Sequence, residues 1–293
     1  MSEPAPLISV IVPHYNDLES LDRCLAALMR QTIARDRFEI VVADNLSPVG
    51  IEAVKECVAG RAEVILASER GAGPARNAGV AASRGATLAF TDCDCDPEPQ
   101  WLEQGIAALD GCDFAGGKMT VLVREGQSKS GPEAFECVFA FDNRSYVLGK
   151  GFTVTANLFC SRSLFDDVGP FLTGVSEDLE WCTRARAKGY RIGYAEQAIV
   201  GHPARVSWPE IKSKWRRLNS ETYALFKSRS GGRVKWLARS WALPLSIIAH
   251  TPAVLFSPAL SGAGERARAW ITLARLRLWR FIDAHRLFIS GEN

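Results

Sequence analysis

Short apolar runs alternate with segments of helical periodicity in the first third of the chain. Four runs are rich in β-branched or other apolar residues, as strands buried on both faces of a parallel sheet are: 8–13, 38–44, 62–68 and 86–92. Between them, apolar or small residues recur at helical spacing in 18–31, 51–60 and 73–85. This alternation predicts an α/β fold with a Rossmann-like, mostly parallel sheet and helices on both of its faces.

Polar residues follow the predicted strands. His14-Tyr15-Asn16 closes the first strand, Asp44-Asn45 the second, and Asp92 the fourth. Because ligands bind at the carboxyl ends of parallel strands, this edge of the sheet is the predicted site. No G-x-G-x-x-G follows the first strand and the chain has no Walker loop, so the sequence lacks the usual phosphate cradles.

The fourth strand runs into T-D-C-D-C-D-P, which places three carboxylates within five residues. In an extended segment alternate side chains point the same way, so Asp92 and Asp94 form a row that Asp96 could extend, and Cys93 and Cys95 face the core. Such a row needs a cation or a proton. Oxygen ligands suit Mg²⁺ or Mn²⁺, shared with phosphates of a substrate. The alternative is a polar turn, since Asp and Pro are common turn residues.

Several segments then occur in an order that carries a family resemblance. They are ISVIVPHYN (8–16), VVADNLSP (41–48), 71–102 around the three aspartates, 155–171 and 174–202. Together they resemble the family-2 glycosyltransferases, which have the GT-A fold, over roughly residues 8–202. The resemblance implies an inverting, metal-dependent enzyme. It would move a sugar from a nucleotide-diphosphate donor to a hydroxyl of a saccharide or lipid-linked saccharide.

The resemblance also implies roles for individual residues. The residues that it implies contact the donor nucleotide are Pro13, Tyr15, Asn16, Asp44, Arg76, Asn77 and Asp92. Metal ligands are Asp94, Asp92 and His202, and the catalytic acids are Asp178 and Glu177. On the acceptor side the candidates are Phe152, Thr155 and Asn157. The chain departs from the family where Asn45 replaces the second of two paired acids, and where Asp96 adds a third acid. Asp92 and Asp94 are the favoured metal pair, because Asp96-Pro97 resembles a loop.

Some of these residues have a structural interpretation as well. Ser176 followed by Glu177 and Asp178 fits a helix start, where acids stabilise the macrodipole. His202 could be a structural histidine, and Arg76 could merely solvate its helix. Sugar transfer needs carboxylates in two separate places. One group holds the metal ion that stabilises the leaving diphosphate, and another carboxylate takes the proton of the acceptor hydroxyl.

Charge divides the chain. Residues 1–202 hold 19 Lys and Arg against 28 acids, and residues 203–293 hold 16 against 5. We expect a catalytic domain over 1–204 and a helical, basic, Trp-rich extension over 205–293. The apolar run 242–260 is interrupted by three prolines, which favours a re-entrant or surface-lying hairpin, and 265–288 predicts a helix. An anionic membrane surface suits this extension. Packing on the catalytic core is the alternative, and no nucleic-acid motif accompanies the charge.

Other features of the sequence limit the possible locations and functions of the protein. The eight cysteines have no C-x-x-C pair or zinc spacing and the opening MSEPAPL is short and polar, so we expect buried free thiols in a reducing cytoplasm. Together with the basic, Trp-rich extension, this predicts a cytoplasmic protein that is peripheral on the inner face of the membrane. The string KWRRL does not match the Q-x-x-R-W signature of processive synthases, so we expect single additions. Two alternatives stay open: a phosphatase of the haloacid-dehalogenase kind, which lacks its G-D-x-x-x-D here, and a non-catalytic nucleotide-sugar binder.

Overall fold

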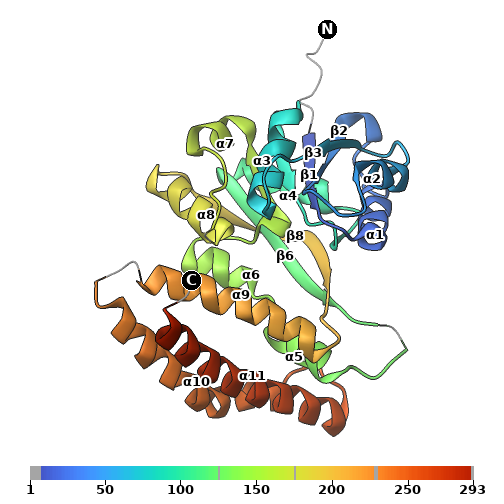
Figure 1. Cartoon of the computed structure of the whole chain (residues 1–293). Coiled ribbons are helices and arrows are strands. Elements are labelled where there is room, and N and C mark those ends of the chain that lie inside the picture. Colours follow the sequence, from blue (N-terminus) through green and yellow to red (C-terminus); the bar gives the residue numbers. More distant parts are fainter. Residues whose placement is uncertain (1–7, 125, 175, 228–229, 292–293) are drawn as a thin grey trace. The chain divides into compact units, whose positions relative to one another are not determined.

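The chain folds into two compact units. The structure, a computed structural model, describes residues 8–124, 126–174, 176–227 and 230–291 (Figure 1). Residue contacts define one unit as Met1–Thr120 with Asp142–His202 and the other as Val121–Phe141 with Pro203–Asn293. The division expected at residue 204 differs from this mainly by segment 121–141. Helix α5 (Gly131–Phe139) of that segment packs on α11 (Gly262–Ser290), a contact between residues far apart in sequence.

Four parallel strands form one half of the sheet, as the sequence predicts. They are β1 (Ile8–His14), β2 (Phe38–Asp44), β3 (Glu63–Leu66) and β4 (Thr87–Phe90). β1 lies between β2 and β4, and β3 is the edge strand beyond β2. The register aligns His14 with Asp44, so the polar strand ends meet at one edge.

The other half of the sheet is antiparallel. It contains β5 (Asp96–Pro97), β6 (Phe114–Leu122), β7 (Leu158–Ser161) and β8 (Ile192–Pro203). The strand order is β3-β2-β1-β4-β7-β6-β8-β5, with antiparallel pairing of β4 with β7, β6 with β7 and β5 with β8. This mixed sheet is of the GT-A kind, and the parallel pairing stops at β4.

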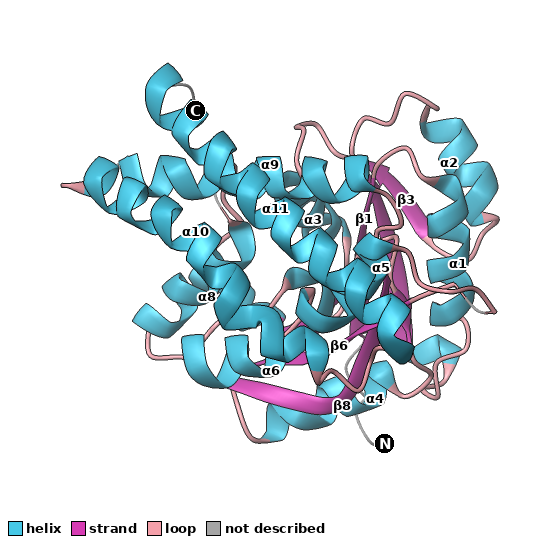
Figure 2. Cartoon of the chain, turned by 90° about the horizontal axis from the view of Figure 1, so that it is seen from below, coloured by secondary structure: helices cyan, strands magenta, loops and turns pink. Residues whose placement is uncertain are grey.

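Helices flank both faces of the parallel strands. On one side are α1 (Leu18–Leu28) and α2 (Ile51–Val58), and on the other is α3 (Ala72–Ala82), as both views show (Figures 1 and 2). The small residues of α3 allow a close approach to the sheet, because a Cβ on Gly79 would lie 2.7 Å from Cγ2 of Ile11. The remaining helices of this unit are α4 (Trp101–Ala107), α6 (Asn143–Ser145), α7 (Arg162–Val168) and α8 (Glu177–Ala187), with short helices at Arg35–Arg37, Ala108–Asp110, Tyr146–Lys150 and Thr155–Asn157.

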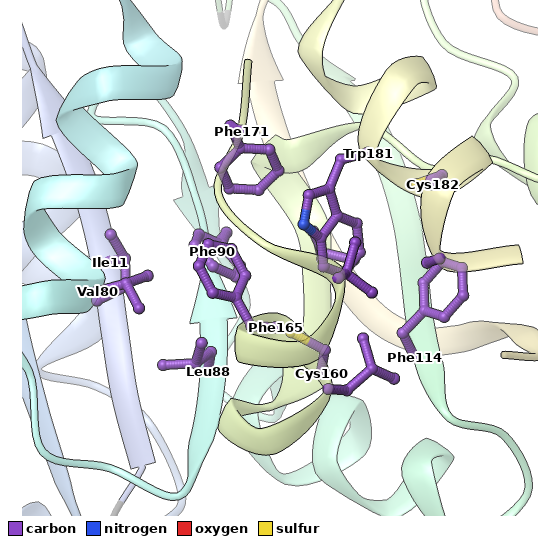
Figure 3. Packing of buried hydrophobic residues seen from close by; sticks show 14 of the residues in the cluster. Ile11, Val80, Leu88, Phe90, Phe114, Cys160, Phe165, Phe171, Trp181 and Cys182 are labelled. Atoms are coloured by element: carbon purple, nitrogen blue, oxygen red, sulfur yellow. The ribbon is translucent and has the colours of Figure 1, made fainter. Parts of the chain in front are cut away.

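An aromatic cluster anchors α8 on the sheet (Figure 3). Phe90 of β4 lies 5.5 Å from Phe171 and 5.9 Å from Phe165, centroid to centroid, and Phe165 stacks on Trp181 of α8 at 5.8 Å. Nε1 of Trp181 donates to the carbonyl oxygen of Gly169. Burying each ring stabilises the fold by about 1.5–3 kcal/mol, so the first turn of α8 is firmly positioned.

The second unit is helical, with α5, α9 (Trp208–Lys227), α10 (Gly232–Leu255) and α11. The predicted helix at 265–288 is confirmed. The expected interruptions at Pro244 and Pro252 are wrong: α10 continues through both prolines, and the chain turns only at 256–261. Packing along α11 outweighs a cost of about 3 kcal/mol for each proline. No helix among the described residues has both the length and the apolarity to cross a bilayer.

Candidate active site

Asp44 is fixed at the end of β2 by three hydrogen bonds. Its Oδ1 lies 2.9 Å from Nδ1 of His14, Ser47 Oγ also donates to Oδ1, and Ser47 N donates to Oδ2 at 3.1 Å. The same Oγ accepts from the backbone N–H of Asn16 at 2.8 Å. Asp44 is 1% exposed, whereas the neighbouring Tyr15 is 50% exposed. The acid is therefore held rigidly in a buried position, whereas the aromatic residue that follows β1 is exposed to solvent.

Asn45 holds the loop that leads into α3. Its Oδ1 accepts from the backbone N–H of Gly71 at 2.8 Å, and its Nδ2 donates to the carbonyl oxygen of Glu69 at 2.7 Å. An acid at this position could not make the second of these bonds, because a carboxylate has no donor. The departure from paired acids thus has a structural reason here.

Arg76 of α3 joins two parts of the site that are a hundred residues apart. It is 2% exposed, and its two terminal nitrogens donate to Oδ1 of Asp92 and to Oε1 of Glu177. Burial disfavours the cation, but the two carboxylates outweigh it and raise the pKa of Arg76. Nε of Arg76 is buried and has no hydrogen-bond partner within the described part of the chain. This ion-pair chain ties the start of α8 to the end of β4.

The segment after β4 is a turn, not an extended row of acids. The N–H of Cys95 donates to the carbonyl oxygen of Asp92 at 3.0 Å, which closes the turn. Oδ2 of Asp94 lies 3.3 Å from Nε2 of His202, while Asp96 points elsewhere and pairs with Arg30 on the exposed surface at 3.4 Å. The expected extended row of Asp92 and Asp94 is wrong, because the turn gives them different partners, Arg76 and His202. The polar turn that the sequence offered as the alternative is what the structure has.

The cysteines of this turn do not compete as ligands. Burial raises the pKa of Cys95, and the Asp92 and Asp94 carboxylates raise it further. The same causes raise the pKa of Cys93, with Asp94 ahead of Asp92. Both stay protonated near neutral pH, and a thiol is a poor ligand for a hard cation. All eight cysteines are free.

α8 begins with the acids that the sequence singles out. Oδ1 of Asp178 accepts from Oγ of Ser176 and from the N–H of Leu179, both at 2.8 Å, and the side chain is half-buried. Glu177 is committed to Arg76. Of the two acids, Asp178 is the one whose charge is not taken up by an ion pair with Arg76.

Asn77 and the acceptor candidates lie in varied surroundings. The side chain of Asn77 donates to the carbonyl oxygen of Phe171 and accepts from its N–H, both at 2.9 Å, so it holds the loop before α8. The ring of Phe152 stacks on that of Tyr146 at 5.1 Å, and Thr155 is buried.

Asn157 is completely enclosed by protein. It donates to the carbonyl oxygens of Lys118 and Ala198 and accepts from Nε1 of Trp101 at 2.9 Å. These contacts favour a structural role over the predicted contact with an acceptor.

The structure therefore brings most predicted residues to one edge of the sheet. The contacts of His14 and Ser47 with Asp44 and the partnership of Arg76 with Glu177 were not foreseen. For His14 the sequence held a signal, because His14 and Asp44 both close predicted parallel strands. Among the described residues no group of three His, Cys, Asp or Glu side chains is arranged to hold a metal ion, so Asp94 and His202 form a pair rather than a closed site.

Comparison with known proteins decides the family. The family model "Glycosyl transferase family 2" matches residues 9–169. The chain belongs to this family. This glycosyltransferase is 32% identical over 224 residues to glycosyltransferase AglE of Haloferax volcanii, which covers 74% of the chain and 73% of AglE. It is 34% identical over 110 residues to validoxylamine A glucosyltransferase of Streptomyces hygroscopicus subsp. jinggangensis, covering 36% of the chain and 26% of that relative.

Solved structures show the same fold. A mannosyltransferase from Pyrobaculum calidifontis, solved with GDP-Man and Mn²⁺, superposes with a TM-score of 0.61 at 18% identity, covering 99% of this glycosyltransferase and 89% of that protein. Residues 1–349 of S. aureus TarS, solved with UDP-GlcNAc, superpose with a TM-score of 0.53 at 18% identity. The superposition covers 98% of this glycosyltransferase and 92% of that TarS chain. The chain spans 55% of the longer TarS. At such identities the likeness concerns the fold alone.

The family match includes the ends of the four parallel strands and the turn with Asp94. It stops before α8 and β8, so Asp178 and His202 lie outside it. Membership of this family makes the protein a transferase of sugars. It excludes the phosphatase alternative, in which the acidic motif follows the first strand and not, as here, the fourth.

Proposed function

We propose that this glycosyltransferase moves a sugar from a nucleotide-diphosphate donor to an acceptor hydroxyl with inversion, and that it needs Mg²⁺ or Mn²⁺. The observation that carries the proposal is the Asp92–Arg76–Glu177 chain of ion pairs. It connects the acids after β4, suited to the donor side, with the first turn of α8, suited to the acceptor side. Two acidic groups with different tasks are thereby held at one edge of the sheet.

The donor's base and ribose fit the ends of β1 and β2. Tyr15 offers an exposed ring for stacking, and Pro13 precedes the buried His14 that contacts Asp44. Asp44 is buried and holds Ser47, whose Oγ in turn holds the backbone of Asn16, so the rim of the nucleotide site is ordered before the donor binds. Direct contact of Asp44 with the nucleotide stays a proposal. Rigid placement of the donor lowers the barrier by fixing the line of attack.

The residues present suit a divalent cation. Oδ2 of Asp94 lies 3.3 Å from Nε2 of His202. The carboxylate suits Mg²⁺ or Mn²⁺, and imidazole is a ligand of transition-metal ions, so the pair favours Mn²⁺ of the two. The side chain of Asp94 is 40% exposed, so solvent reaches part of it. Two protein ligands leave positions for the donor's diphosphate, as is usual for such ions. A bound cation would neutralise the departing diphosphate as a Lewis acid.

Asp178 is the proposed base. It takes the proton of the acceptor hydroxyl as that oxygen attacks the anomeric carbon. Ser176 and Leu179 hold its Oδ1, which aims the carboxylate without neutralising it. One base opposite the leaving group, with no covalent intermediate, gives inversion. Glu177 serves as a positioning residue through Arg76.

The acceptor proposed is a saccharide or a lipid-linked saccharide that receives a single sugar. The basic second unit supports work at an anionic membrane surface, on its cytoplasmic side. Phe152 and Thr155 stay proposed acceptor contacts.

The decisive experiment measures donor binding against metal. UDP-, GDP- and dTDP-sugars are titrated into the protein by calorimetry with and without Mn²⁺, and nucleotide release is then followed with membrane extract as acceptor. Asp94→Asn should weaken metal-dependent donor binding by about 100-fold, since it removes a charged ligand. Asp96→Asn is the matched control, because Asp96 follows this turn directly, at the start of β5, and pairs with Arg30. Equal donor binding by wild type and Asp94→Asn refutes the metal assignment.

A further inference from the structure

One face of α10 is exposed and wholly apolar. From the middle of the helix to the following turn, every exposed residue lacks a polar side chain: Trp241, Ala242, Leu245, Ile248, Ala249, Pro252, Ala253, Leu255 and Phe256. Ile248 is 76% exposed and Phe256 is 83% exposed. Helices that face water carry polar residues on the outside, so this face is suited to a non-aqueous surrounding.

α11 extends the same surface. α10 and α11 pack side by side, as the contacts and both views show (Figures 1 and 2). Exposed apolar residues recur on α11 at helical spacing: Ile271, Leu278, Ile282 and Ile289. Trp270 is 40% exposed, and Trp241 is 62% exposed. We call the exposed apolar residues of the two helices the α10–α11 face.

The charge that borders this face has one sign. Between residues 232 and 290 the chain has nine Lys and Arg but only two acids, Glu265 and Asp283, which are 8% and 5% exposed. Glu265 pairs with Lys129, and Asp283 accepts from Asn219. The exposed charge of the two helices is therefore entirely positive.

Three arginines gather where the helices meet α9. Arg239 of α10 lies over the ring of Trp236, 5.7 Å from its centroid. Arg280 of α11 lies 4.0 Å from the centroid of Trp215 and donates to Oδ1 of Asn219. Nε of Arg277 is buried without a hydrogen-bond partner among the described residues.

The charges of these arginines are poorly compensated. Burial lowers the pKa of Arg277, and the neighbouring Arg239 lowers it further. Burial also lowers the pKa of Arg280 to about 9, with Arg277 and Arg239 adding to the effect and Asp283 opposing it. An external anion would relieve this repulsion, and guanidinium groups match phosphate in geometry.

We propose that the α10–α11 face lies in the headgroup region of an anionic lipid bilayer, with Arg239 and Arg277 binding lipid phosphate. Arg280 is 4% exposed and acts only through its repulsion of these two. Apolar side chains on one face and arginines beside them are the features of a helix that lies in the plane of the interface. Trp241 and Trp270 suit the level of the headgroups. The inference rests on the proposed peripheral association and adds the surface and the lipid chemistry to it.

The test is binding of the full chain to vesicles, measured by co-sedimentation without donor or acceptor. Vesicles of phosphatidylcholine alone are compared with an equal mixture of phosphatidylcholine and phosphatidylglycerol. Binding should be at least about tenfold stronger to the anionic vesicles. Leu245→Glu/Ile248→Glu should weaken it by about tenfold or more, since two apolar side chains become charged. Because no turnover is involved, failure of the catalytic proposal leaves this result unaffected.

Matched variants separate charge from apolar contact. Met29→Glu/Leu66→Glu adds the same two carboxylates at exposed apolar positions of the first unit and should bind as wild type does. Arg239→Gln/Arg277→Gln should lose the preference for anionic vesicles yet melt no lower than wild type, because it relieves repulsion. A tenfold excess of inorganic phosphate over lipid should compete little if lipid is the source of the phosphate, and full competition refutes a lipid site.

Two outcomes overturn the proposal. One is equal binding of wild type to neutral and anionic vesicles, or binding to neither. The other is a dimer in sedimentation that Leu245→Glu/Ile248→Glu dissociates while no vesicles are bound, which would assign the face to a second copy of the chain.

Discussion

Replacing Asp178 by Asn tests the base without disturbing the fold. Oδ1 of Asp178 accepts two hydrogen bonds, from Oγ of Ser176 and the N–H of Leu179, both at 2.8 Å. The amide oxygen of Asn can accept both of them in the same rotamer. What the variant loses is the negative charge and the ability to take up a proton.

The structure allows both effects to be sized. Loss of a carboxylate from the first turn of α8 costs about 0.3–1 kcal/mol through the helix macrodipole. Loss of a general base lowers the rate by about 10²–10⁴-fold. That factor corresponds to about 3–5 kcal/mol of transition-state stabilisation. The effect on rate should therefore exceed the effect on stability several times.

The assay compares kcat for acceptor-dependent nucleotide release, donor affinity by calorimetry, and the melting temperature. We expect Asp178→Asn to keep donor affinity while turnover collapses. Glu180→Gln is the matched control, since Glu180 lies in the same first turn, carries the same charge and pairs with Arg184 instead. A loss below about tenfold for Asp178→Asn, or an equal loss for both variants, would show that Asp178 is not the base.

Three further predictions follow from particular contacts. Arg76→Lys should destabilise the protein by about 2 kcal/mol and lower kcat, because an ammonium cannot donate to Asp92 and Glu177 together; an unchanged melting curve contradicts this. Asn157→Ala should lower stability by about 3 kcal/mol while donor affinity is kept, as denaturant titration and calorimetry can show, since its three hydrogen bonds are buried. The bidentate contact with Arg124 holds the pKa of Glu133 at about 2, below its usual 4.5. The stabilisation by Glu133 is therefore complete above pH 4.5 and is lost as the pH falls toward 2. The difference in melting temperature between wild type and Glu133→Ala should be largest above pH 4.5 and should shrink as the pH falls toward 2.

The sequence determined the parallel half of the fold and the edge where chemistry gathers. β-branched runs and small-residue helices have periods that leave little choice of structure. Asp44, Asp92 and Asp94 were recognisable because each follows such a run directly. The same kind of periodicity predicted the helix at 265–288 of the second unit. It did not predict a continuous α10, because prolines usually interrupt a helix and only the packing on α11 outweighs that effect.

Only the tertiary structure decided the partners of the charged groups. A pattern along the chain cannot tell that Arg76 would meet Glu177, because the two come together through the burial of Phe90, Phe171 and Trp181. The sequence also could not choose between the extended row and the polar turn after β4, since both backbones suit the same residues, and the structure has the turn. Helices and buried strands depend on residues that are close together in the sequence, so their periodicity can be recognised there. Ion pairs and antiparallel strand partners depend on how distant segments pack, which the local sequence does not specify.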